Sequence, residues 1–140
     1  MRLISLAQRP ALWWAGVIIW FGVLYFLSSQ SALPNPKFTY SDKVAHFCYF
    51  ALGSIAFYLG LRLCRPNLSS VRTAFATVIF AGIVGWFDEW HQSFVPGRSG
   101  NDIGDWMADL AGGIFACFTG GFLFHWIKNR AKDEATLSNE

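Results

Sequence analysis

The sequence predicts an all-α fold, an integral membrane bundle of four transmembrane helices, and three observations support this. Hydrophobic residues make up 54% of the 140 residues and charged residues only 14%, whereas a soluble domain has roughly 25% charged residues. The apolar residues gather in four long runs without a charge. Tryptophans lie near the ends of these runs, where indole rings prefer the interface between lipid and water. We therefore predict a single membrane domain over residues 1–140, which excludes an ordinary water-soluble enzyme.

The four apolar runs follow one another in the order Ala11–Leu27, Val44–Leu61, Thr73–Phe87 and Leu110–Ile127. A bilayer core of about 30 Å needs about 20 helical residues, so each run must borrow from its flanks. The third run is the shortest and needs Arg72 to extend toward the headgroups. The predicted spans are about 11–27, 44–61, 71–90 and 106–127, followed by a polar cytoplasmic tail over 129–140.

The distribution of Lys and Arg predicts the orientation. The first segment, the loop after the second run and the tail together carry eight of these residues, whereas the two other loops carry three, Lys37, Lys43 and Arg98. The positive-inside rule therefore places both termini in the cytoplasm. The alternative is a cleaved signal peptide over residues 1–33, but its apolar run exceeds the usual length of about 7–15 residues. The charge count also argues against cleavage.

Small residues recur at helical spacing along three runs. They are Ala108, Gly112, Ala116 and Gly120 on the fourth, Thr77, Ala81 and Gly85 on the third, and Gly53, Ala56 and Gly60 on the second. Such stripes let helix backbones approach closely in a membrane. They predict a tight bundle of the second, third and fourth spans, with a homodimer through one of these helix faces as the other possible use.

Ionisable and polar side chains gather where the second, third and fourth spans reach the outer face. Because Asp105, Asp109 and Gly112 share a helix face, both carboxylates are predicted to point into the bundle. Glu89 continues the third small-residue row and should also face inward, whereas Asp88 is expected to face water. Asp102 is expected to cap the fourth helix. The candidate ligand-binding residues are Lys43, His46, Glu89, His91, Gln92, Arg98, Asp105 and Asp109.

Each of these residues also has a structural interpretation. Lys43 can extend to the interface, and His46 can be an interhelical hydrogen-bond partner as well as a base or ligand. Arg98 can neutralise Glu89 or Asp109, and Gln92 can close a hydrogen bond in the loop. A metal site of His46, Glu89, His91 and Asp109 finds weak support, because Glu89 and His91 are two residues apart and do not share a helix face. We therefore predict no cofactor and no resident metal, with a divalent cation as the alternative.

Three segments give the chain a family resemblance. The Asp42-Lys43-x-x-His46-Phe47 string, the Asp88–Ser99 segment with its Pro96-Gly97-Arg98 turn, and Gly104–Asp109 followed by Gly112 resemble the VanZ-like family. This resemblance implies a multi-pass protein of the bacterial cytoplasmic (inner) membrane and nominates Lys43, His46, Glu89, His91, Gln92, Arg98 and Asp105. The founding member is associated with teicoplanin resistance, so a link to glycopeptide susceptibility is an expectation. The interval from Arg98 to Asp105 is one residue longer than expected, which leaves Asp102 and Asp105 as alternatives for the family acid.

Three hypotheses of function follow. In the first, an outward-facing polar pocket binds a cell-envelope lipid, its headgroup or a lipid-linked cell-wall precursor through Arg98 and Lys43. In the second, an intramembrane hydrolase or transferase acts on such a lipid, with His46 or Glu89 as general base and Asp105 orienting a histidine. In the third, the polar groups only lock the bundle. Nucleic acid is not an expected partner, because no basic cluster is interleaved with exposed aromatic residues.

Overall fold

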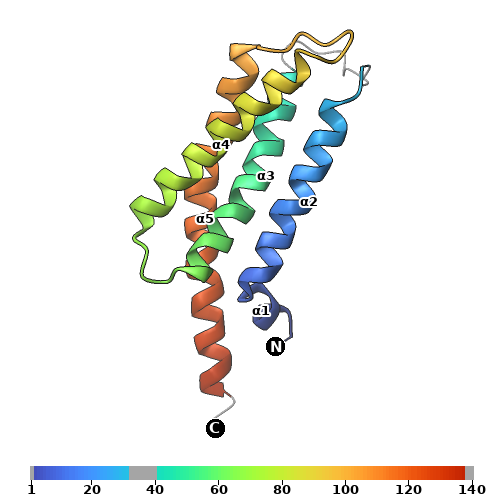
Figure 1. Ribbon diagram of the computed structural model, residues 1–140. Coiled ribbons are helices and arrows are strands. Elements are labelled where there is room, and N and C mark those ends of the chain that lie inside the picture. The colour runs from blue at the N-terminus through green and yellow to red at the C-terminus, as the bar shows by residue number, and fades with distance from the viewer. Residues whose placement is uncertain (1, 32–40, 138–140) are drawn as a thin grey trace.

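The computed structural model describes residues 2–31 and 41–137, and within them it contains helices and no strand. The helices are α1 (Arg2–Ala7), α2 (Pro10–Ser28), α3 (Ser41–Cys64), α4 (Ser70–Gln92) and α5 (Ile103–Leu137). The four longer helices are each long and apolar enough to cross a membrane, which confirms the predicted fold class. Figure 1 shows them running side by side, with both termini at one end. Lys37, which entered the charge count, lies outside the described residues.

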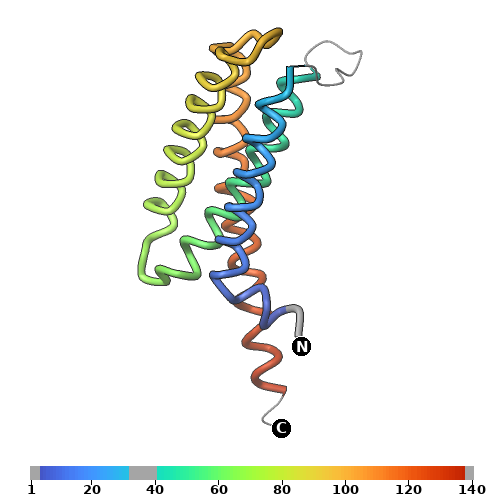
Figure 2. The backbone as a smooth tube through the Cα atoms, turned by 45° about the vertical axis from the view of Figure 1, so that its right-hand side comes forward, coloured from blue at the N-terminus to red at the C-terminus, as the bar shows by residue number. Residues whose placement is uncertain are grey.

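Two helical segments extend beyond the prediction. The short helix α1 was not expected, and α5 continues as helix to Leu137 through most of the predicted tail. At 1.5 Å per residue, the 35 residues of α5 span about 50 Å, which exceeds the bilayer core. Figures 1 and 2 show the last part of α5 projecting beyond the other helices.

The surface of the long helices is apolar, as a lipid environment requires. Ile18, Phe75, Phe118 and Phe122 each expose about two thirds or more of their surface. Soluble monomers rarely expose so continuous an apolar surface. Inside the bundle, the hydroxyls of Thr73 and Thr77 donate to backbone carbonyls four residues earlier, so these buried groups are satisfied.

Helix α3 is the centre of the bundle and packs against α2, α4 and α5. Its approach to α5 depends on Gly112, because a Cβ added there would lie 2.5 Å from the carbonyl oxygen of Phe47 and 2.9 Å from the amide nitrogen of Ala51. The next residue, Gly113, faces Ala81 of α4. The small residues of α4 and α5 thus pack within the chain, as the tight-bundle interpretation predicted, and the homodimer stays a prediction.

Helix α2 is fixed to α3 by a reciprocal pair of hydrogen bonds. The indole Nε1 of Trp20 donates to the backbone oxygen of Tyr49 at 2.9 Å, and the Tyr49 hydroxyl donates to the backbone oxygen of Trp20 at 2.8 Å. The Trp20 ring occupies the space above Gly53. Tryptophan rings of α2 therefore pack against the glycines of α3, so the tight bundle includes the first span as well.

Substituting Gly112 by Ala should lower the free energy of unfolding by about 1–3 kcal/mol, because the neighbours of the new methyl group are backbone atoms that cannot rotate away. Thermal unfolding in detergent measures this effect as a lower melting temperature. Gly22→Ala is the matched control, since no atom lies within 4 Å of its added Cβ. Equal melting temperatures for the two variants would contradict the close α3–α5 approach.

Candidate functional site

The site begins with Asp102, which caps α5 at the end of the bundle opposite the termini. Its Oδ1 accepts hydrogen bonds from the backbone N–H of Gly104 at 2.7 Å and of Asp105 at 3.4 Å, which confirms the predicted cap. The Gly104 bond, assisted by the nearby Lys43 ammonium, lowers the pKa of the Asp102 carboxyl below its ordinary value. Asp102 is therefore a carboxylate at neutral pH.

A buried pair, His46 and Asp109, joins α3 to α5. His46 Nδ1 lies 2.9 Å from Asp109 Oδ1, and the Asp109 side chain is fully buried. An ionised carboxylate can only accept a hydrogen bond, so the imidazole Nδ1–H donates. Gly85 of α4 makes room for the acid, since a Cβ there would lie 2.5 Å from Asp109 Oδ2. Three helices therefore enclose this pair.

Glu89 faces the bundle, as its helical row predicted, and exposes only 4% of its surface. Its Oε2 accepts the backbone N–H of Asp102 at 2.7 Å, and its backbone oxygen accepts the N–H of Asn101 at 3.3 Å. These two bonds tie the end of α4 to the start of α5. The other carboxyl oxygen, Oε1, is buried without a hydrogen-bond partner among the described residues.

Lys43 lies between two acids of α5. Its Nζ is 2.9 Å from Asp105 Oδ1 and 3.4 Å from Asp102 Oδ2. Lys43 therefore does more than extend to the interface, since it neutralises the buried Asp105. The acid that holds a histidine is Asp109, so the prediction that Asp105 orients a histidine by a hydrogen bond is wrong for His46.

The side chains of His46, Glu89 and Asp105, all possible metal ligands, lie close together. One ligand atom from each lies within 4.8 Å of the other two. His91, which the weaker metal interpretation had included, lies elsewhere. Its ring stacks on Tyr25 of α2 at a centroid distance of 4.8 Å, and its Nε2 is 3.1 Å from Ser29 Oγ.

Asp88, Gln92 and Arg98 form a second group on the side of α4 that faces α2. Asp88 Oδ2 accepts from Gln92 Nε2 at 2.8 Å, and Gln92 Oε1 accepts from Arg98 Nε and Nη2 at 3.1 and 2.6 Å. The expectation that Asp88 faces water is wrong, because only 6% of its surface is exposed. Arg98 pairs with neither Glu89 nor Asp109, although one interpretation had expected such a pair. Its partner is the Gln92 side chain, which therefore does more than close a hydrogen bond in the loop.

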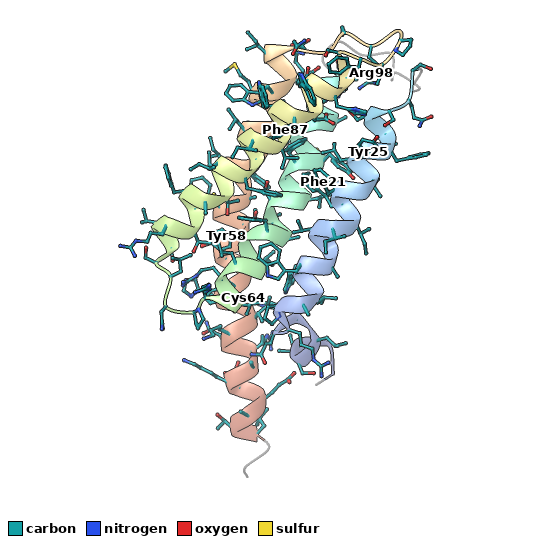
Figure 3. All side chains as sticks on the ribbon, in the orientation of Figure 1. Phe21, Tyr25, Tyr58, Cys64, Phe87 and Arg98 are labelled. Carbon is teal, nitrogen blue, oxygen red and sulfur yellow. The ribbon has the colours of Figure 1, made fainter. Side chains whose placement is uncertain are left out.

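A pocket of about 140 Å³ opens beside this second group. Its polar lining comes from α2, α3, α4 and the following loop, and consists of Ser28, His46, Tyr49, Asp88, Gln92 and Arg98. Leu24 and Asp88 also line an apolar groove of about 440 Å³ between α2 and α4, together with Phe21, Tyr25, Phe87, Trp90 and Phe94. Figure 3 shows Arg98 at the same end of the bundle as Tyr25 and Phe87, far from Cys64. The polar pocket and the apolar groove are therefore neighbours.

The comparison with known families agrees with this architecture. A family model described as VanZ/LLP1 matches residues 13–126 of the chain. This range includes nearly all of α2, all of α3 and α4, and α5 as far as Trp126, with every candidate site residue. No match was found among curated proteins or among solved structures.

Replacing His46 by Phe should lower the free energy of unfolding by about 3–5 kcal/mol, because it leaves the buried Asp109 without its hydrogen-bond donor. Asp109→Asn should cost less, since an amide oxygen can still accept the Nδ1–H bond. Denaturant unfolding in mixed micelles measures both changes. The control is His125→Phe at the exposed far side of α5; an equal effect of the two histidine substitutions would contradict the importance of the pair.

Proposed function

The chain belongs to the VanZ/LLP1 family, and from that premise we propose that it is a multi-pass protein of the bacterial cytoplasmic membrane that binds an anionic cell-envelope lipid. The phosphate-bearing headgroup occupies the polar pocket beside Arg98. The main support for this proposal is that the Arg98 guanidinium has no carboxylate partner among the described residues. Arg98 is half-buried at the pocket, and none of the carboxylates in residues 2–31 and 41–137 forms an ion pair with it.

The charge of Arg98 is not neutralised by a carboxylate in the described part of the bundle, so it is available to an anionic ligand. Nε and Nη2 share one neutral acceptor, the amide oxygen of Gln92, and the other N–H groups of the planar guanidinium remain for a phosphate. Gln92 also separates Arg98 from the buried Asp88 carboxylate. Lys43, in contrast, already has two carboxylate partners, so Arg98 alone is assigned to the anion.

The apolar groove between α2 and α4 provides a place for the lipid chain. It shares Leu24 and Asp88 with the polar pocket and is lined mainly by aromatic and aliphatic side chains. Ligand sites commonly combine such apolar walls with a few polar groups that fix orientation. A single lipid can therefore place its phosphate at Arg98 and its first methylenes along Phe21 and Phe87.

Arg98→Ala should weaken the binding of phosphatidylglycerol or a polyprenyl phosphate about tenfold or more, because a charge-assisted hydrogen-bond pair to phosphate is lost. Native mass spectrometry of the protein in neutral detergent measures this binding during a lipid titration. Phosphatidylcholine serves as the comparison lipid, and its binding should change little.

The matched control is Arg72→Ala, which removes an exposed arginine at the opposite end of α4. Equal lipid binding by wild type and Arg98→Ala would contradict the proposal and leave the interpretation in which the polar groups only lock the bundle. Release of free phosphate during incubation would instead indicate the hydrolase alternative, since binding alone returns the lipid intact.

The proposal places the pocket in the outer leaflet, with both termini in the cytoplasm, because Lys and Arg are concentrated at the end of the termini. In a variant whose three cysteines are replaced by serine, Ser99→Cys should react with a membrane-impermeant maleimide in intact cells. Thr136→Cys, near the end of α5, should react only after permeabilisation. The reverse labelling pattern would indicate the opposite membrane orientation and would contradict a site in the outer leaflet.

A further inference from the structure

The polar cluster between α3, α4 and α5 carries more negative than positive charge. Among the described residues, this cluster contains four carboxyl groups, those of Glu89, Asp102, Asp105 and Asp109. Lys43 pairs with Asp102 and Asp105, and His46 pairs with Asp109. Three of the four acids are buried. Uncompensated charge is costly at membrane depth, so such acids require protons or a further cation.

Each of three side chains has one polar atom fixed by a neighbour and a second atom left for a ligand. The His46 Nδ1–H is held by Asp109, which leaves Nε2. Glu89 Oε2 accepts the Asp102 N–H, which leaves Oε1. Asp105 Oδ1 accepts from Lys43, which leaves Oδ2. Metal ligands are typically oriented by second hydrogen bonds of this kind, and a histidine bound to a carboxylate is a frequent example.

The unpartnered Glu89 Oε1 is an independent sign of a missing ligand. The side chain is 96% removed from solvent, yet this oxygen has no donor among the described residues. A buried polar atom without a partner is uncommon in folded proteins. Glu89 also lines a pocket of about 360 Å³ with Trp86, Asn101 and Trp106, so this pocket borders one of the three side chains.

The geometry points to a binding site for one divalent first-row metal cation, such as Zn²⁺ or Mn²⁺, formed by His46, Glu89 and Asp105. One ligand atom of each lies within 4.8 Å of the other two, so displacements of about 1 Å would bring all three to the bonding distance of about 2.1 Å from one ion. The imidazole nitrogen suits Zn²⁺ and the two carboxylate oxygens suit Mn²⁺, whereas Mg²⁺ favours oxygen ligands alone. The ion would link α3, α4 and α5 and offset the excess of carboxylates.

This site is separate from the proposed lipid contact. Gln92 at the end of α4 and Arg98 in the following loop line the pocket beside α2, whereas Glu89 contacts the start of α5. His46 is the one residue that lines the lipid pocket and also belongs to the metal site. Metal binding is therefore measured without lipid. Failure to find a metal ion would not change the expected effect of Arg98→Ala on lipid binding, so the two proposals are tested separately.

The test is the metal content of the full-length protein, purified through a tag without histidines, stripped with a chelator and reloaded with Zn²⁺ or Mn²⁺. Inductively coupled plasma mass spectrometry should find about one ion per chain in wild type. Glu89→Gln, which is nearly isosteric, and His46→Gln should each reduce this content about tenfold or more. His125→Gln, a histidine on the exposed side of α5, should retain the wild-type content.

Cobalt substitution supplies a measurement that does not depend on variants that fold. Wild type loaded with Co²⁺ should show the visible d–d absorption of a protein-bound ion, and Zn²⁺ should displace it. Circular dichroism verifies the helix content of each variant. Wild-type metal content no higher than that of Glu89→Gln, or full content in both His46→Gln and Glu89→Gln, would overturn the assignment.

Discussion

The pair formed by His46 and Asp109 between α3 and α5 is the interaction on which the rest of the site depends. In a membrane, a buried carboxylate without a partner is costly, so this pair fixes which faces of the two helices meet. It also needs two close approaches, one allowed by Gly112 at the α3–α5 contact and one by Gly85 beside the Asp109 carboxylate. Fixing Nδ1 of His46 in turn sets the orientation of its ring in the wall of the polar pocket.

Charged side chains lie on two sides of α4. On the side of α5, Glu89 and its neighbouring acids outnumber Lys43. On the side of α2, the Gln92 amide bridges Asp88 and Arg98 and keeps the acid and the guanidinium from pairing directly. A neutral bridge of this kind holds Arg98 in place without neutralising it. The proposed cation site and the proposed anion site therefore lie on opposite sides of the same helix.

Much of this site follows from helical spacing in the sequence. The helical period of 3.6 residues correctly predicted that Glu89, Asp105 and Asp109 face the bundle. Glu89 continues a row of small residues, and the two aspartates share a face with Gly112. Spacing could not decide which acid meets which base, since Asp105 and Asp109 lie on one face and only the relative height of α3 assigns Lys43 to one and His46 to the other. The position of Trp20 in the middle of the first apolar run, away from the interface, is the sequence feature that indicates packing of α2 against α3.

The burial of Asp88 shows why the remaining features needed the three-dimensional structure. The sequence places Asp88 one position around α4 from Glu89, on a face that only water would cover if α2 stood apart. The Trp20–Tyr49 hydrogen bonds hold α2 against α3, and Leu24 then lines the same pocket as Asp88. Because this acid is enclosed, Gln92 must satisfy it, and the other end of the amide then receives Arg98. The hydrogen bonds between Trp20 and Tyr49, which join α2 to α3, therefore contribute to the placement of the Arg98 charge at the pocket.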